Sequence, residues 1–369
     1  MKRFALSLAA LVLALASMAQ THRMLVGTYT EGTSAEGVYL FSFDESTAAA
    51  TLLGVAPSGN PSFVVTSPDG THAYAVNEYN DGRQGVSAFS LEGSSIRALG
   101  SRPIPREQVS GEDPCNLLYL GDALLSANYT GGSVTAFPLD KAGRIGPMSQ
   151  FSAPSIVDEN AHPLSHMHCA TLSPDGQYIF VTDLGLDLIH RFRRGQGGAP
   201  LGIGTVAWKN ADNFPYGPRH FIFSADGRFA YLLCELGDQL VVFSYADGEL
   251  TPIQTLTAYD GGGKGSADLH LSPDGRFLYT SHRLQEDGIA IFAVDPLTGL
   301  VEKAGYQPTG KHPRNFAISP EGRFLLCACR DSNCIEVYRI NPETGALSRT
   351  DQTIQLGAPV CITFVPDNN

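Results

Sequence analysis

A unit recurs along this chain about every fifty residues: an apolar run, the sequence Ser-Pro-Asp-Gly or a close variant, and a second apolar run. Five clear copies and two diverged ones occupy residues 63–70, 116–122, 170–176, 221–227, 269–275, 316–322 and 360–367. Each unit predicts two strands joined by a tight turn, and further apolar runs before the next unit predict two more. Four strands per unit at this period are typical of a propeller blade.

The two ends of the chain predict how the ring closes. Residues 24–30 and 37–43 have the pattern of strands that lack a preceding inner strand, and residues 359–366 have that of an inner strand without followers. One end therefore completes the other, which leaves only short edges unpaired. The sequence predicts an all-β protein: a seven-bladed β-propeller with four-stranded blades, closed by N- and C-terminal strands that share one blade.

The N-terminus has the pattern of a secretory signal peptide. Lys2 and Arg3 precede a long apolar run, and small residues end at Ala19 before the polar Gln20. We expect residues 1–19 to be removed and residues 20–369 to form a single propeller domain. The protein is then exported, periplasmic or secreted, with no membrane association after cleavage.

Charge and cysteine usage exclude several classes of partner. The formal net charge of −12 becomes −14 without Lys2 and Arg3, which disfavours nucleic acids and anionic membranes. Seven cysteines are an odd number, and most lie within predicted strands, so we expect buried free thiols rather than a disulfide framework. No metal-site spacing is present, and we expect no metal, no cofactor and a monomer or weak dimer.

Repeat-equivalent positions bring charged residues to one mouth of the channel. The fifth residue before each turn Ser gives a first ring: Ser62, His168, Arg219, Ala267 and Arg314, with Cys115 and Val360 in the diverged units. The ninth residue after each turn Asp or its Glu counterpart gives a second ring: Glu78, Leu184, Glu235, Arg283 and Arg330. Arginines suit carboxylate or phosphate, and His168 or a Glu suits proton transfer near neutral pH. The two rings predict an anion-binding acid/base site; inter-blade salt bridges are the structural alternative.

Two other residues near His168 have more than one interpretation. His166 and His168 point the same way if this segment is extended, so a metal pair is conceivable, but the spacing reveals no third ligand. Asp183 could face the channel, although a carboxylate that closes a turn or a strand end is the simpler interpretation. Hydrolase signatures such as Gly-x-Ser-x-Gly are absent from the sequence.

Several motifs together resemble the lactonase family of seven-bladed propellers, which includes propeller-type 6-phosphogluconolactonases and carboxy-muconate lactonizing enzymes. The resemblance covers nearly the whole mature chain and rests on residues 25–30, His168 with residues 183–187, residues 217–220, 235–236, 267–279 and 313–316. Around Arg283 the sequence departs from the family pattern, which has an Asn before this Arg and a small residue after it.

The resemblance implies hydrolysis of a sugar lactone to an aldonate in carbohydrate metabolism, with 6-phosphogluconolactone as the family substrate. It implies catalytic roles for His168, Glu235, Arg219 and Arg283. Further expected substrate contacts are Arg314, Arg330, Glu78, His166, His270 and Asp183. Export conflicts with a cytosolic phosphorylated substrate. A lactonizing cycloisomerase and a non-catalytic exported binding propeller are the alternatives.

Overall fold

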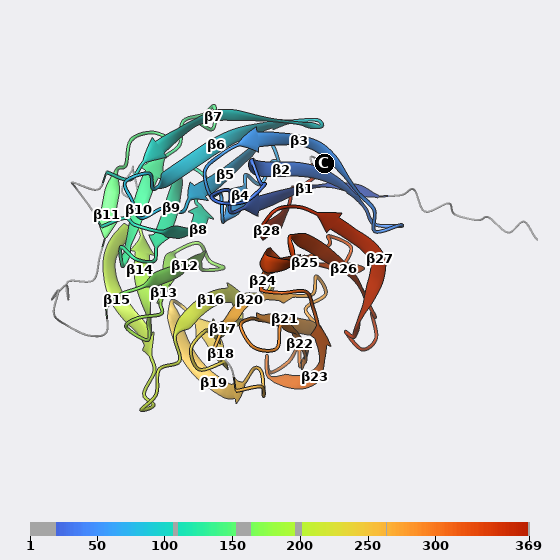
Figure 1. Ribbon diagram of the computed structural model, residues 1–369. Coiled ribbons are helices and arrows are strands. Elements are labelled where there is room, and N and C mark those ends of the chain that lie inside the picture. The colour runs from blue at the N-terminus through green and yellow to red at the C-terminus, as the bar shows by residue number, and fades with distance from the viewer. Residues whose placement is uncertain (1–19, 106–109, 153–163, 196–200, 263, 368–369) are drawn as a thin grey trace, which may run out of the picture.

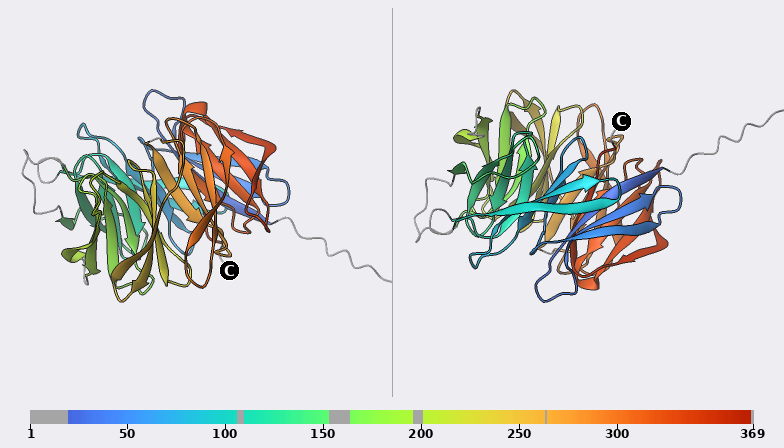
Figure 2. Two further views of the ribbon diagram at one scale, coloured as in Figure 1. Left: turned by 90° about the horizontal axis from the view of Figure 1, so that it is seen from below. Right: turned by 90° about the horizontal axis from the view of Figure 1, so that it is seen from above.

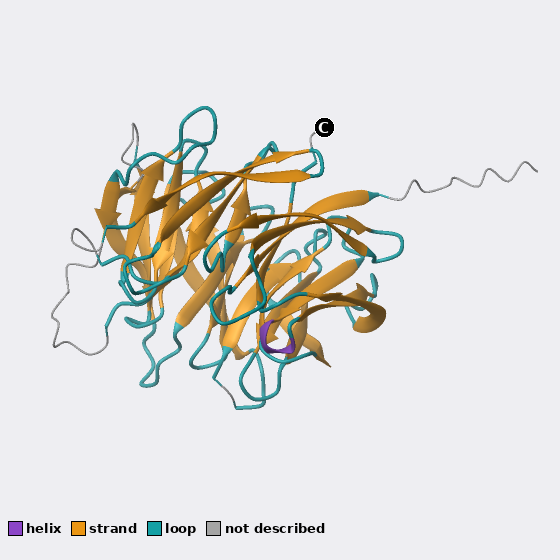
Figure 3. Cartoon of the chain, turned by 45° about the horizontal axis from the view of Figure 1, so that its top comes forward, coloured by secondary structure: helices purple, strands orange, loops and turns teal. Residues whose placement is uncertain are grey.

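In a computed structural model, the protein forms seven four-stranded antiparallel sheets arranged in a ring (Figure 1). The structure describes residues 20–105, 110–152, 164–195, 201–262 and 264–367. The expected signal peptide at 1–19 lies outside the described residues. The only helix among these residues is the 3-10 turn η1 (Arg330–Ser332), the single purple element of Figure 3. The predicted all-β propeller is confirmed.

The inner strands of the blades surround the central axis, and neighbouring inner strands contact one another around the ring. They are β4 (Val64–Thr66), β8 (Pro114–Tyr119), β12 (Met167–Leu172), β16 (Pro218–Phe223), β20 (Ser266–Leu271), β24 (Pro313–Ile318) and β28 (Pro359–Phe364). Their partners, the second strands, are β5 (His72–Asn77), β9 (Ala123–Asn128), β13 (Tyr178–Asp183), β17 (Phe229–Cys234), β21 (Phe277–His282), β25 (Phe324–Cys329) and β1 (Thr21–Thr28).

The third and fourth strands complete each blade toward the rim. The third strands are β6 (Gly85–Glu92), β10 (Ser133–Pro138), β14 (Leu188–Arg194), β18 (Gln239–Ala246), β22 (Gly288–Val294), β26 (Cys334–Ile340) and β2 (Gly37–Asp44). The outer strands are β7 (Ser95–Pro103), β11 (Gln150–Ser152), β15 (Leu201–Lys209), β19 (Glu249–Thr257), β23 (Val301–Pro308), β27 (Leu347–Gln355) and β3 (Ala50–Pro57).

Ring closure follows the prediction. The C-terminal strand β28 pairs antiparallel with β1, so the closing blade has the order β28-β1-β2-β3 and contains both ends of the propeller. The side views show the blades as a thick disc with this shared blade at one edge (Figure 2). Because strands from both ends complete one sheet, β1 is paired on both of its edges, by β28 and by β2.

The Ser-Pro-Asp-Gly turns join the inner and second strands by a repeated set of hydrogen bonds. In the first blade the Ser67 hydroxyl donates to Asp69 at 2.5 Å and accepts from the backbone N–H of His72 at 3.0 Å. Gly70 has φ +62°, a left-handed conformation that favours glycine, and the four equivalent glycines have the same sign of φ. The repeat therefore encodes a turn, and the turn fixes which ends of the inner strands face which side of the disc.

Apolar side chains of adjacent blades form seven buried clusters, one between each pair of blades. One cluster, for example, joins Tyr74 and Val86 of the first blade to Leu117 and Phe137 of the next. Strands β5, β9 and β21 are buried along nearly their whole length, which explains why apolar residues occur on both faces of these strands. The core thus lies between blades and leaves the axis to polar side chains.

Candidate active site

A β-bulge opens most of the inner strands, and the extra residue is the first-ring residue. In β12 the register passes from Met167 to Cys169 against consecutive partners, which leaves His168 as the inserted residue. The same irregularity contains Cys115, Arg219, Arg314 and Val360, and the bulge in β20 contains Ala267. A bulge redirects a side chain that regular alternation would send elsewhere. Local backbone geometry therefore turns the first ring toward the axis.

The second ring lies directly after the second strands. Glu235 follows β17 and Arg283 follows β21, and their backbone N–H groups donate to the carbonyls of Gly217 and Gly265. Glu78, Leu184 and Arg330 make the equivalent bond in their own blades. Both rings are therefore held at the face of the disc opposite the Ser-Pro-Asp-Gly turns.

The first ring surrounds a small cavity on the axis. Its volume is about 20 Å³, and a cavity of roughly 10–15 Å³ by this measure holds one water molecule. It is lined by Ser62, Phe63, Cys115, Asn116, His168, Arg219, His220, Asp268, Arg314, Asn315 and Val360. Six of the seven first-ring positions therefore line one space, and the cavity has room for water but not for a sugar.

His168 is the titratable first-ring side chain in this cavity. It is 8% exposed, and its Nδ1 atom is buried without a hydrogen-bond partner, while the edge of its ring contacts Tyr129 at a centroid distance of 6.0 Å. Burial, followed by the charges of Arg219 and Arg314, holds its pKa well below the ordinary value. The imidazole is therefore neutral at neutral pH, with a nitrogen available to accept a proton.

Glu235 joins two arginines above the cavity. Its carboxylate accepts from Arg219 Nε at 2.7 Å and lies 3.0 Å from Nη2 of Arg283. Burial opposes ionisation of Glu235, but the two arginines outweigh it, and its pKa lies below the ordinary value. Burial and the charge of Arg219 lower the pKa of Arg283 to about 9. Glu235 and Arg283 are therefore both charged at neutral pH, with 22% of the Glu235 side chain exposed.

A second ionic cluster occupies the opposite wall. Glu78 accepts from the Tyr29 hydroxyl at 2.8 Å and from Ser62, and it lies 3.6 Å from Arg314. The Arg314 guanidinium lies 5.5 Å from the centroid of the Tyr29 ring. Glu78 and Arg314 therefore reach the site from opposite sides of the ring closure, with Tyr29 between them.

The other expected contacts have different positions. His166 stacks on Tyr129 and makes a 2.9 Å hydrogen bond with the Tyr129 carbonyl at the rim. Arg330 donates to Asp331, which lies 3.5 Å from His312, and His312 lies 3.4 Å from Arg283. Arg330 is thus at the outer edge of the same mouth, and it is connected to Arg283 only through Asp331 and His312.

Asp183 closes a turn and is absent from the lining of the cavity. It is fully buried and accepts from Ser165, His190 and the backbone N–H groups of His166 and Leu186. This position agrees with the simpler interpretation of Asp183 and leaves its carboxylate no free oxygen for a substrate. No group of three His, Cys, Asp or Glu side chains within the described ranges has the geometry to hold a metal ion.

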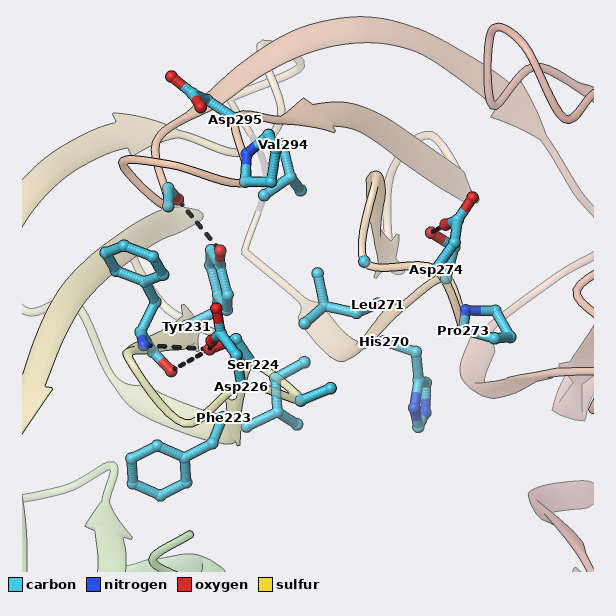
Figure 4. Close-up of a pocket in the computed structure, with 17 residues that line it drawn as sticks. Phe223, Ser224, Asp226, Tyr231, His270, Leu271, Pro273, Asp274, Val294 and Asp295 are labelled. Carbon is cyan, nitrogen blue, oxygen red and sulfur yellow. Dashed lines mark hydrogen bonds between the residues drawn. The ribbon is translucent and has the colours of Figure 1, made fainter.

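His270 belongs to the opposite face. It lines a cavity of about 490 Å³ between β16–β17 and β20–β21, beside the turns that contain Asp226 and Asp274 (Figure 4). Because inner strands run from the ring residues to these turns, the channel separates His270 from the mouth that holds Glu235. Its link to the site is indirect, through Asp268, which bonds His270 at 3.0 Å and His220 at 2.5 Å.

A third ring of residues lies one position beyond the first ring and was not among the predicted site residues. The fourth residue before each turn Ser gives Phe63, Cys169, His220, Asp268 and Asn315, with Asn116 and Cys361 in the diverged units. Two asparagines of this ring bond the next blade: Asn116 accepts from the N–H of Ala170, and Asn315 from that of Ile362. Because a bulge directly precedes the third-ring residue, two successive residues of an inner strand face the axis. Strict alternation of side chains along a strand does not predict this. The fourth residue before each turn Ser identifies these positions from the sequence alone.

The sequence matches a known protein family over nearly its whole length. The profile of the family "Lactonase, 7-bladed beta-propeller" matches residues 23–364. The chain therefore belongs to the lactonase family of seven-bladed propellers, and it is a hydrolytic enzyme of that family, a lactonase.

Named relatives are similar over nearly their whole length. The chain is 33% identical to 6-phosphogluconolactonase from Formosa agariphila over 90% of this chain and 96% of that protein. It is 30% identical to 6-phosphogluconolactonase from Bacillus subtilis over 92% and 97%. It also superposes on the periplasmic gluconolactonase of Pseudomonas aeruginosa with a TM-score of 0.86 at 33% identity, covering 94% and 99% of the two chains. The described part of the chain contains no helix that could cross a membrane.

Proposed function

We propose that this lactonase opens the ring ester of a sugar lactone of the gluconolactone type, using His168 as the base that activates water. The observation that carries the proposal is the buried His168 imidazole, which has an unpartnered Nδ1 and which lines, together with Arg219 and Arg314, a cavity that fits one water. A neutral imidazole accepts a hydrogen bond from that water, and the mouth above it holds the positive charge that the reaction needs.

In the first step the water oxygen attacks the lactone carbonyl carbon as one water proton passes to His168. The carbonyl oxygen becomes an oxyanion, which the guanidiniums of Arg219 and Arg283 stabilise. Their charge exists before the substrate arrives and requires no reorganisation. A preorganised donor of this kind contributes about 3–4 kcal/mol to the transition state.

In the second step the tetrahedral intermediate collapses and the bond from carbon to ring oxygen breaks. The proton held by His168 passes to the leaving ring oxygen, which becomes the hydroxyl of the aldonate. The new carboxyl group loses its proton to solvent, so each turnover releases one proton and regenerates a neutral imidazole. Of the two candidate bases, His168 suits this role because Glu235 is held as an anion between two arginines.

Glu235 orients the oxyanion donors in this scheme. Its carboxylate fixes Arg219 by a 2.7 Å bond and Arg283 by a 3.0 Å contact, and the carbonyls of Ala267 and Gly265 bind other nitrogens of the same guanidiniums. Each arginine is held at two points, so its remaining N–H groups have defined directions. This arrangement supports a positioning role for Glu235.

The remaining charges face the sugar. Arg314, Glu78 and Tyr29 form the wall that would contact hydroxyl groups, since they offer both donors and an acceptor. Arg330 is 30% exposed at the rim and is the group best placed to meet a phosphate at the far end of a substrate. The expected export of the chain favours an unphosphorylated lactone, as the name of the Pseudomonas aeruginosa relative also does.

Acid release in a pH-stat tests the proposal. Residues 20–369 are assayed with glucono-δ-lactone and with 6-phosphogluconolactone, beside His168→Asn and the control His72→Asn, whose histidine lies on the turn face near Ala142. Hydrolysis above the spontaneous rate, retained in the control and lost in His168→Asn, is the expected result. Equal rates with and without protein on both lactones would refute the proposed substrate class, and the preference between the two shows whether phosphate contributes to binding.

A further inference from the structure

A second cavity opens on the face of the disc that carries the Ser-Pro-Asp-Gly turns. It lies between the blade of β16–β19 and the blade of β20–β23, and its volume of about 490 Å³ is within the range of small-molecule sites, roughly 300–1,000 Å³. The ring of Tyr231 in its lining is 1% exposed, whereas Asp226 and Asp274 are exposed. A small molecule can therefore reach the cavity from solvent without passing the mouth that holds Glu235.

The gap between the blade of β12–β15 and the blade of β16–β19 shows what fills such a space elsewhere in the ring. Tyr245, near the end of β18, reaches back to the blade before its own. Its hydroxyl donates to Asp175 Oδ2 at 3.0 Å. Its ring lies edge-on to Phe180 and Phe223, at centroid distances of 6.0 Å and 5.0 Å. An aromatic ring thus fills this gap and ends in one hydrogen bond to a turn carboxylate.

Val294 occupies the position of Tyr245 at the open cavity. The backbone N–H of Tyr245 donates to the Arg228 carbonyl, and that of Val294 donates to the Arg276 carbonyl. Each arginine directly follows the glycine of its turn, and the registers of β18 and β22 against their second strands agree with this equivalence. Valine has neither the ring nor the hydroxyl of tyrosine, so the side chain that fills the earlier gap is missing from this one.

Each contact of Tyr245 has a counterpart in the lining of the cavity. Counting from the turn Ser of each blade gives these equivalent pairs: Phe180 and Tyr231, Phe223 and Leu271, Asp175 and Asp226. Tyr231, Leu271 and Asp226 all line the cavity, and Figure 4 shows them with Val294 around one open space. The cavity therefore contains the place of a missing tyrosine side chain, with its apolar walls and its acceptor retained.

The rim adds negative charge to this space. Asp226, Asp274 and Asp295 line the cavity, and none of its described lining residues is a lysine or an arginine. Asp226 accepts from Arg228 Nε at 2.7 Å, whereas Asp274 uses only its Oδ1 atom, for the Ser272 hydroxyl and one backbone N–H. Burial opposes the ionisation of Asp274, but these hydrogen bonds outweigh it and its pKa lies below the ordinary value. A cationic ligand group therefore suits this rim better than an anionic one.

We propose that this cavity binds a small phenol that carries an ammonium group, a ligand of the tyramine class. The ring lies between Tyr231 and Leu271, where apolar contacts hold it. The hydroxyl donates to Asp226, as that of Tyr245 donates to the equivalent carboxylate, and a carboxylate oxygen accepts more than one hydrogen bond. The ammonium group forms a charge-assisted bond with Asp274. This site is on the opposite face from His168, so the inference does not depend on the proposed lactone chemistry.

Isothermal titration calorimetry at pH 7 with residues 20–369 tests the ligand class. We expect tyramine to bind with a Kd of about 1 mM or below. The anion 4-hydroxyphenylacetate has the same phenol and should bind at least about tenfold more weakly, because it lacks the charge-assisted bond. No binding of tyramine up to about 10 mM, or equal affinities for the two phenols, would overturn the proposal.

Two substitutions at equivalent positions locate the ligand. Val294→Tyr restores the missing side chain and should abolish tyramine binding, whereas the matched control Tyr245→Val should retain the wild-type affinity at the cavity. Unchanged binding in a Val294→Tyr variant that is folded by circular dichroism would overturn the site. A dimer of the wild type that Val294→Tyr abolishes, seen by sedimentation velocity without ligand, would assign the cavity to a second copy of the chain and would also overturn it.

A substitution at the rim tests the ammonium contact without filling the cavity. Asp274 is exposed, so we expect Asp274→Asn to fold as the wild type does. It should weaken tyramine binding about tenfold and leave the affinity for the uncharged phenol p-cresol unchanged. Equal losses for tyramine and p-cresol, or no loss for either, would overturn the assignment of a cationic ligand.

Discussion

Replacing Glu235 by Gln tests the ionic cluster at the mouth of the site. The substitution keeps size and shape but removes the negative charge that lies 2.7 Å from Arg219 and 3.0 Å from Arg283. Those guanidiniums are 3% and 6% exposed, so two positive charges remain buried side by side without a counterion. Breaking a buried pair by removing one partner costs about 3–5 kcal/mol.

The expected loss lies near the lower end of that range. Because 22% of the Glu235 side chain is exposed, water screens part of the interaction, and we expect Glu235→Gln to lower the free energy of unfolding by about 3 kcal/mol at pH 7. The pKa of Glu235 is depressed in the folded protein, so its contribution is present above the unfolded value of 4.5 and disappears as pH falls through the folded value. The difference between wild type and variant should therefore be constant above about pH 5 and shrink below it.

Urea unfolding followed by the fluorescence of Trp208 measures the loss of unfolding free energy and its dependence on pH. Trp208 is the single tryptophan, and it packs edge-on against Phe243 at a centroid distance of 5.7 Å. The control Glu249→Gln removes the partner of Arg191 at a site 69% exposed, where we expect less than about 1 kcal/mol. A Glu235→Gln variant as stable as wild type at pH 7, or a difference independent of pH down to pH 3, would refute the electrostatic reasoning.

Three further predictions concern the base, the axial network and ring closure. His168→Asn should lower kcat about 10²–10⁴-fold without moving the urea midpoint. Because the pKa of His168 is depressed, the kcat/KM of the wild type should also stay level from about pH 8 to about pH 6. A decline of kcat/KM centred on about pH 6.5 in buffered assays would contradict a lowered pKa. Asp268→Asn leaves the His220 charge buried without its carboxylate and should cost about 3–5 kcal/mol in urea unfolding, whereas an unchanged midpoint would show that His220 is neutral. Gly27→Ala places a Cβ atom 2.2 Å from the Pro61 carbonyl, near the C-terminal end of β1 in the closing blade, and should cost about 1–3 kcal/mol. Gly54→Ala, whose Cβ atom would lie 3.5 Å from Ile96, is the control, and equal effects of the two substitutions would refute the steric argument.

The fold could be predicted because each blade repeats the same local information. Ser67 and Asp69 close their turn with hydrogen bonds among near neighbours, and the equivalent residues do so in other blades. Interactions of this range depend on the order of residues alone. The missing inner strand at one end and the surplus strand at the other likewise predicted the closing blade that β28 and β1 form.

The site could be predicted only in outline. Repeat positions correctly brought His168, Arg219 and Arg314 to one cavity, because equivalent residues of a propeller converge on its axis. Asp183 and His270 were expected at the substrate, but one closes a turn and the other lines the opposite face. Sequence spacing cannot distinguish a carboxylate that binds its own blade from one that faces the axis.

The sequence by itself determined the number of blades, the turns, the closure and the type of charge at the axis, since all of these follow from periodic or local patterns. Only the tertiary structure decided which charges pair. Arg219 and Arg283 share Glu235 across two blades, and Asp268 binds His220 of the preceding blade. The physical reason is the bulge at the start of the inner strands, which turns two successive residues toward the axis and lets partners some fifty residues apart come within bonding distance.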